Sequence, residues 1–143
     1  MPASDEMPAS DEPTPYYLDS SVALRIVLGH STSAIDWFND MRDQGARMVS
    51  SRLLELEMTR VLRRESLPIT WAEEFIDRLL LLRLDDALLV EAAAIRPHIK
   101  TLDALHLASA RRIGAGHVTV ATHDANMARV AEQLGFAVVD PVE

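Results

Sequence analysis

The sequence predicts an α/β protein, a three-layer α/β/α sandwich around a central, mostly parallel sheet of four to five strands. Short apolar segments alternate with amphipathic helical segments along the chain. Strands joined through helices pair in parallel, with right-handed crossovers that cover both faces of the sheet. Aliphatic residues dominate and aromatic residues make up only 5%, which suits helices layered on a sheet better than a β-sandwich. The length of 143 residues fits one domain with a sizeable core and is too short for two ordinary ones.

The beginning of the chain differs in composition from the rest. The sequence Met-Pro-Ala-Ser-Asp-Glu occurs twice in tandem, as residues 1–6 and 7–12, and Pro-Thr-Pro follows it. Polar, proline-interrupted repeats of this kind do not form a packed core. We therefore expect residues 1–15 to be a disordered leader, to which we assign no function, and residues 16–143 to form a single domain.

Four short apolar segments read as strands, each bounded by polar or turn-forming residues. The expected strands are 16–19, 47–50, 118–121 and 136–139. The first two begin the chain's alternating pattern and the last two end it. Because the carboxyl ends of parallel strands carry the functional residues in such sheets, the residues that follow 16–19 and 118–121 are of particular interest.

Seven segments with helical periodicity connect these strands. In chain order they are 21–28, 33–44, 53–64, 70–80, 86–94, 102–113 and 125–134. Glycine ends four of them, at Gly29, Gly45, Gly114 and Gly135. Ser33 is expected to cap the second helix. Thr70-Trp71-Ala72-Glu73 reads as a capping box for the fourth, which would carry Leu79 and Leu80 on its apolar face.

Composition narrows the classes of function. The absence of cysteine excludes a disulfide framework and thiolate chemistry. No apolar run approaches the roughly 20 residues needed to span a bilayer, and residues 1–15 lack the features of a secretory signal. We expect a cytoplasmic protein with no membrane partner.

The net charge of −8 argues against a general nucleic-acid binder, but the charge is unevenly distributed. The four acids of the leader account for half of the net charge, while six arginines lie between positions 42 and 64. Arginine suits bidentate phosphate contacts, so Arg60 and Arg64 are candidates to anchor RNA phosphates. A solvated helix face explains the same arginines equally well.

Four acidic residues stand where the local pattern buries or caps a side chain. Asp19 follows the first strand, Glu57 interrupts the apolar stripe of helix 53–64, Asp103 opens helix 102–113, and Asp124 follows strand 118–121. Each has an ordinary explanation. Asp19 and Asp124 are good N-cap residues. The helix dipole stabilises the negative charge of Asp103 in the first turn of its helix. Glu57 can pair with Arg60, three residues further along the helix, or it needs a cation or a proton.

If these four carboxylates converge, they predict a site for a hard divalent cation, Mg²⁺ or Mn²⁺. Asp19, Asp103 and Asp124 are then the expected ligands, directly or through water, and Glu57 is a ligand or a base that orients water. The nearby Glu55 is a weaker candidate, because it points to the far side of its helix.

The remaining acids and the histidines are expected to have structural roles. Asp85, Asp86 and Asp140 read as turn or capping residues. The five histidines lack the spacing of a zinc site. Of these, His123 is expected to come closest to the acids, because it precedes Asp124 at a strand end.

The same residues fall in motifs that resemble those of PIN-domain nucleases. The matching segments are Tyr17-Leu18-Asp19-Ser20-Ser21, residues 50–57 with Arg60 and Arg64, Thr101-Leu102-Asp103-Ala104-Leu105-His106-Leu107-Ala108-Ser109-Ala110, and Thr119-Val120-Ala121-Thr122-His123-Asp124. The third is the most specific, and the resemblance spans residues 16–140. Within the family, the length of the chain and the residues of its motifs are similar to those of the VapC-type toxins of toxin–antitoxin pairs.

This resemblance implies a metal-dependent endoribonuclease acting as the toxin of a VapBC-type pair. Asp19, Glu57, Asp103 and Asp124 would be its acids and Thr122 an accessory hydroxyl. It also implies a homodimer, an RNA substrate and a VapB-like antitoxin partner whose C-terminal segment occupies the groove.

Two other functions fit parts of the sequence. A non-catalytic PIN-like scaffold would bind RNA or protein without cleaving it, although the complete set of four acids argues against that. A receiver-like phospho-acceptor domain also gathers acids at strand ends. It needs an acidic pair and a lysine in the pocket, whereas Asp19 has no adjoining acid and Lys100, the only lysine, is expected to lie in the wrong place.

Overall fold

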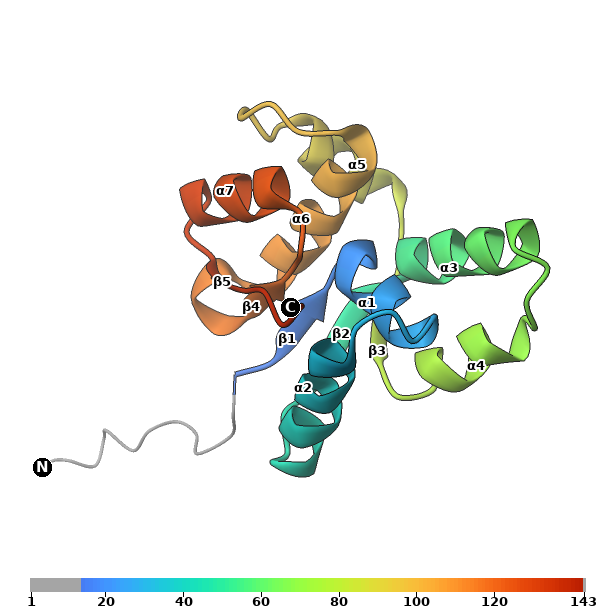
Figure 1. Ribbon diagram of the computed structural model, residues 1–143. Coiled ribbons are helices and arrows are strands. Elements are labelled where there is room, and N and C mark those ends of the chain that lie inside the picture. The colour runs from blue at the N-terminus through green and yellow to red at the C-terminus, as the bar shows by residue number, and fades with distance from the viewer. Residues whose placement is uncertain (1–13, 143) are drawn as a thin grey trace, which may run out of the picture.

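The computed structural model describes residues 14–142 and shows one five-stranded sheet (Figure 1). The strands are β1 (Tyr16–Leu18), β2 (Met48–Ser51), β3 (Leu80–Leu82), β4 (Thr119–Ala121) and β5 (Ala137–Val139). Their order across the sheet is β3-β2-β1-β4-β5, and all four pairings are parallel. The predicted α/β sandwich with a parallel sheet of four to five strands is confirmed.

Within residues 14–142, seven α-helices surround the sheet. They are α1 (Ser20–Val27), α2 (Thr32–Asp43), α3 (Arg52–Arg64), α4 (Thr70–Ile76), α5 (Asp86–Ala93), α6 (Thr101–Ile113) and α7 (Ala125–Gln133), and a short 3₁₀ turn, η2 (Ala115–His117), precedes β4. In Figure 1, α1 to α4 lie on one side of the strands and α6 and α7 on the other. Helix α5 packs against α6.

Alternating residues of the central strands feed two separate cores, because successive side chains of a strand point to opposite faces. Leu18 of β1 packs in one core with the buried faces of α1 to α4. Its neighbour Tyr17 packs in the other, with Leu107 of α6 and Met127 of α7. Each face of the sheet therefore has its own apolar layer, and the strands that hold the site are buried on both sides.

Three details of the predicted elements are wrong. Ser31, not Ser33, caps α2 by accepting a hydrogen bond from the Ala34 backbone N–H at 3.1 Å. The Ser33 hydroxyl instead donates to the carbonyl of Pro141 at 2.7 Å. Thr70 makes no capping hydrogen bond at the start of α4, so the capping box is not formed.

The third error concerns β3, which the sequence pattern places in a helix. Helix α4 ends at Ile76, and Leu80 pairs with Val49 as the first residue of an edge strand. An apolar run such as Leu79–Leu82 fits a helix face and a short strand equally well. Its hydrogen-bonding partner, the free edge of β2, is a tertiary feature that a local pattern does not contain.

Most of the expected leader lies outside the described residues, which begin at Thr14. Pro15 is tied to the fold, since its carbonyl accepts a hydrogen bond from the Thr119 backbone N–H at 3.0 Å. Within residues 14–142, the helices are too short or too polar for any of them to cross a bilayer.

Candidate active site

Asp19 and Asp124 lie at the topological switch point of the sheet, between β1 and β4. The chain adds β2 and β3 on one side of β1, and β4 and β5 on the other. Asp19 directly follows β1 and caps α1, while Asp124 follows β4 and caps α7. The backbone N–H of Asp19 donates to the carbonyl of Ala121 at 3.2 Å, which joins the two strand ends. The crevice at such a switch point is where α/β sheets place their ligands.

A cavity of about 400 Å³ opens at this edge, and all four predicted acids line it. Glu57 reaches it from the second turn of α3 and Asp103 from the first turn of α6. The four carboxylates come from segments spread over more than a hundred residues, and the fold brings them to one cavity. Their roles as ligands or base remain predictions.

Asp19 is held by a set of fixed donors although it is only 2% exposed. One carboxylate oxygen accepts from the Ser21 hydroxyl at 2.7 Å and the Val22 N–H at 3.2 Å. The other accepts from the Thr122 hydroxyl at 2.5 Å. Capping and placement in the cavity therefore occur in the same side chain, and Thr122, the predicted accessory hydroxyl, orients it.

The acids influence one another electrostatically. Burial raises the pKa of Asp19 above its ordinary value, and the hydrogen bonds from Thr122 and Ser21 offset part of that rise. Burial also raises the pKa of Asp103, and the negative charges of Asp124, Asp19 and Glu57 raise it further. Carboxyl groups in this state favour a proton or a cation as partner.

Glu57 has a partner that the sequence did not predict. Its Oε1 lies 2.8 Å from Nε2 of His106, a fully buried residue of α6. The alternative pairing with Arg60 is not formed. The pattern contained one signal for His106, because a residue three positions after Asp103 lies on the same face of a helix.

The donor set fits a hard divalent cation, since the four acids that line the cavity offer carboxylate oxygens as ligands. Within the described residues, no three acidic or histidine side chains already lie close enough to hold one ion. Coordination thus requires side-chain adjustment or bridging water, which Mg²⁺ commonly retains.

Basic residues approach the acids from two directions. Arg60 and Arg64 line a neighbouring groove of about 560 Å³, which shares Glu57 with the acidic cavity. Arg25 and Lys100 line the acidic cavity itself. The expectation that Lys100 lies in the wrong place is therefore wrong, because the loop before α6 brings it to the cavity wall.

The other polar predictions have mixed outcomes. The His123 ring pairs with Asp140, with Nδ1 to oxygen at 3.0 Å, and only its backbone N–H reaches the site, donating to Ser21 at 2.8 Å. His106, not His123, is the histidine whose ring contacts a predicted acid. Asp85 caps α5 as expected, and Glu55 pairs with Arg52 away from the cavity.

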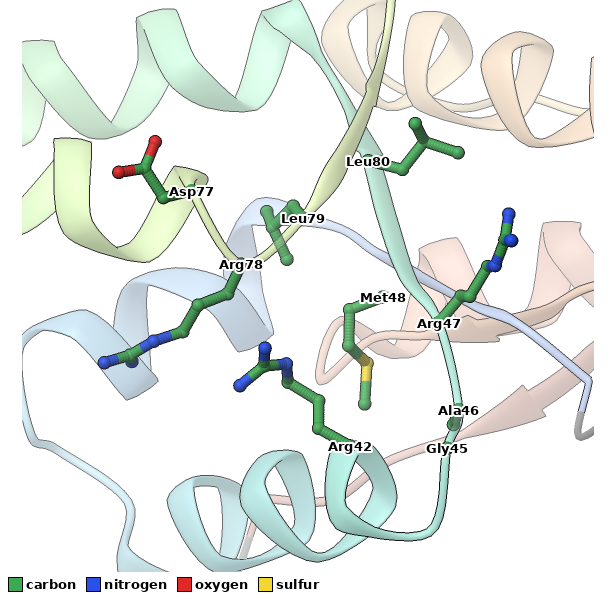
Figure 2. A pocket seen from close by; sticks show the side chains of 9 residues that line it. All are labelled: Arg42, Gly45, Ala46, Arg47, Met48, Asp77, Arg78, Leu79 and Leu80. Atoms are coloured by element: carbon green, nitrogen blue, oxygen red, sulfur yellow. The ribbon is translucent and has the colours of Figure 1, made fainter.

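A second cavity of about 400 Å³ lies at the opposite end of the sheet, beside the starts of β2 and β3. Arg42, Arg47 and Arg78 line it together with one acid, Asp77. Figure 2 shows Arg42 and Arg78 extending to one side of Met48 while Arg47 points in another direction. Its arginines therefore do not converge on one point.

Comparisons with known proteins agree with this architecture. Residues 16–133 match the family described as PIN domain. The chain is 32% identical over 133 residues to "Ribonuclease VapC35" of Mycobacterium tuberculosis H37Rv, with 87% of this chain and 96% of that protein covered. It is 34% identical over 128 residues to "Ribonuclease VapC46" of the same strain, with the same coverage.

Solved structures show the same fold at lower identity. The DNA-bound VapBC of Salmonella typhimurium superposes with a TM-score of 0.68 at 18% identity, covering 90% of this chain and 99% of that one. VapBC2 of Rickettsia felis, bound to a promoter DNA fragment, gives 0.65 at 12% identity, covering 87% and 97%. The chain belongs to the PIN-domain family, in its VapC group.

Proposed function

We propose that this protein is a metal-dependent endoribonuclease that hydrolyses RNA phosphodiester bonds as the toxin of a VapBC-type toxin–antitoxin pair. The observation that carries the proposal is the shared cavity, in which Asp19, Glu57, Asp103 and Asp124 meet at the switch point of the sheet. The two Mycobacterium tuberculosis relatives, which are named as ribonucleases, support the reaction class.

In this proposal Asp19, Asp103 and Asp124 hold Mg²⁺ or Mn²⁺, directly or through water. The ion, when bound, supplies Lewis-acid stabilisation of phosphoryl charge and a water of lowered pKa. Glu57 orients the attacking water or accepts its proton. Ser21 and Thr122 keep both oxygens of Asp19 in place.

Substrate binding follows from the charges around the acids. RNA phosphates would be repelled by four carboxylates alone. Arg60 and Arg64 in the adjoining groove, with Arg25 and Lys100 on the cavity wall, supply compensating positive charge. An RNA strand laid along the groove would reach the acids past Glu57, which borders both spaces.

The partners belong to the same proposal. The structural neighbours from Salmonella typhimurium and Rickettsia felis are VapBC complexes bound to DNA. We propose a homodimer that pairs with a VapB-like antitoxin in the cytoplasm. A small open reading frame beside the gene should encode that antitoxin, and its product should copurify with this chain.

The test of the reaction is cleavage of labelled RNA by the full chain with Mg²⁺, with Mn²⁺ and with EDTA. We expect cleavage only with metal, and loss of cleavage in Asp19→Asn and Asp103→Asn. Asn preserves the N-cap of α1 at position 19, so circular dichroism of both variants should match wild type. Equal cleavage by variants and wild type would refute the assignment of the acids.

A further inference from the structure

A chain of hydrogen bonds runs from the core of the protein to Glu57. The Tyr17 hydroxyl lies 2.7 Å from Nδ1 of His106, and Nε2 of His106 lies 2.8 Å from Oε1 of Glu57. The Tyr17 and His106 rings meet edge to face, with centroids 5.7 Å apart. Three elements that are distant in sequence, β1, α6 and α3, thus meet in one line of contacts.

Burial makes this line rigid. Tyr17 and His106 are each 0% exposed, and the Glu57 side chain is 18% exposed. No buried side-chain nitrogen or oxygen in residues 14–142 lacks a hydrogen-bond partner. A buried imidazole with both nitrogens engaged cannot rotate without leaving a polar atom unpaired, which costs about 1–3 kcal/mol.

The direction of the hydrogen bonds follows from the surrounding groups. A phenol keeps its proton at neutral pH, so the Tyr17 hydroxyl can donate it to Nδ1 of His106, 2.7 Å away. The Ser50 and Ser109 hydroxyls, which also lie near Tyr17, donate to the backbone carbonyls of Leu18 and Leu105. Ser51 remains as the hydroxyl that can donate to the Tyr17 oxygen.

If Tyr17 donates to Nδ1, the imidazole carries its proton on Nε2 and donates it to Glu57. The hydrogen bond on one ring nitrogen sets the protonation of the other. We propose that Tyr17 and His106 are positioning residues that hold Glu57 as a hydrogen-bond acceptor through Oε1 and leave its second oxygen for the cavity.

This inference rests on the proposed function, in which Glu57 orients water or ligates the ion. A carboxylate on a long side chain samples several rotamers unless it is fixed, and catalysis depends on its placement. Outer partners that orient a ligand or base typically change activity by roughly 10- to 100-fold when removed. Neither Tyr17 nor His106 borders the acidic cavity, so both act through Glu57.

The kinetic test compares two phenol deletions on the same strand. Tyr17→Phe removes the donor to His106, and Tyr16→Phe is the matched control, because its hydroxyl contacts only Met41 sulfur, at 3.6 Å, among the described residues. With labelled RNA and Mg²⁺, we expect Tyr17→Phe to lower kcat roughly 10- to 100-fold with little change in KM. Tyr16→Phe should retain wild-type kcat.

Two further arms separate positioning from general stability. His106→Gln keeps an amide donor for Glu57 and should retain more activity than His106→Leu. In a Glu57→Gln background, Tyr17→Phe should have no additional effect on single-turnover cleavage, because the coupled residues act as a unit. Additive losses, or unchanged kcat in Tyr17→Phe, would overturn the proposal.

A second readout does not depend on activity. Long-range ¹H–¹⁵N NMR spectra of the wild-type chain report which imidazole nitrogen of His106 carries the proton. We expect it on Nε2 alone in wild type, and a mixture of tautomers in Tyr17→Phe. A proton on Nδ1 in wild type overturns the proposal. If wild type does not cleave RNA, the proposed function fails. The spectra alone then decide whether Tyr17 sets the protonation of His106 toward Glu57.

Discussion

The two ends of the parallel sheet carry cavities of similar size, about 400 Å³, and of opposite charge. The carboxyl end gathers four acids from four separate segments of the chain. The amino end gathers three arginines from the short segments around the starts of β2 and β3 (Figure 2). Both would attract a charged ligand if charge alone decided the matter.

The difference between the two ends lies in burial and in fixed partners. Asp19 is 2% exposed and accepts hydrogen bonds from two hydroxyls and a backbone N–H. Arg42, Arg47 and Arg78 are exposed, and no ion pair within residues 14–142 involves them. Neutral hydrogen-bond donors do not cancel the charge of a buried carboxylate, whereas an exposed guanidinium is solvated at little cost. The acidic end therefore favours a cation or a proton as partner, and the arginine end has no such need.

The largest expected effect comes from neutralising one acid at the carboxyl end of the sheet. Asp124→Asn should lower RNA cleavage more than roughly 100-fold, because losing a ligand exceeds the loss of an outer partner. Asn still caps α7 at this position, so the fold should be kept. Single-turnover cleavage of labelled RNA with Mg²⁺ measures the loss.

Asp77→Asn is the matched control at the arginine end. Asp77 is exposed, follows the last residue of α4 and lines the arginine cavity. Cleavage by this variant should equal that of wild type. If Asp77→Asn and Asp124→Asn lost activity equally, the contrast between the two ends would have no functional meaning.

The sequence was sufficient to predict the layers of the fold and the edge that holds the site. Alternating strand and helix segments imply parallel pairing, and parallel pairing brings the residues after β1 and β4 to one edge. Asp19 and Asp124 could therefore be placed at that edge from the sequence alone. Glu57 and Asp103 could be placed on buried helix faces by their spacing from apolar neighbours.

The features that could not be predicted depend on contacts between distant segments. The strand β3 exists because β2 offers a free edge, and the contact between Glu57 and His106 joins residues 49 positions apart. Lys100 reaches the cavity only through the path of the loop before α6. Local periodicity places His106 on the same helix face as Asp103, but it does not identify Glu57, the free edge of β2 or the acidic cavity as partners.

A smaller effect is expected from the basic residues beside the acidic cavity. Arg60→Ala and Arg64→Ala should raise KM for RNA, since both side chains line the groove that adjoins Glu57. If each contacts one phosphate, each substitution should reduce the slope of log KM against log salt by about 0.7. Cleavage kinetics over a range of KCl concentrations measure this slope.

The matched arginine variants belong to the other cavity. Arg47→Ala and Arg78→Ala remove the same charge from the far end of the sheet. They should leave KM and its salt dependence unchanged. A slope reduced equally by all four substitutions would mean that RNA responds to overall charge and not to the groove.

The smallest expected effect is on stability, and it reports the charge state of the acids without any substrate. The pKa values of Asp19 and Asp103 are raised in the folded state above the ordinary 3.8. Between 3.8 and those raised values, the folded protein binds more protons than the unfolded chain. Stability in EDTA should therefore rise as the pH falls into this window, and decline as the pH rises through the folded pKa values.

Thermal melts in EDTA over a series of pH values from 7 down towards 3.8 can isolate the contribution of Asp103. Asp103→Asn removes one repelling carboxylate, so at pH 7 it should melt a few degrees above wild type, with about 4 °C corresponding to 1 kcal/mol. Its gain in melting temperature as the pH is lowered through this series should be smaller than that of wild type, because one of the two shifted carboxyls is gone. Asp77→Asn, from the arginine end, should keep the wild-type gain, since its carboxylate is remote from the cluster. Identical pH dependence of stability in Asp103→Asn and wild type would show that the acids at the carboxyl end do not interact, like the separate arginines at the other end. The two ends of the sheet would then differ only in the sign of their charge.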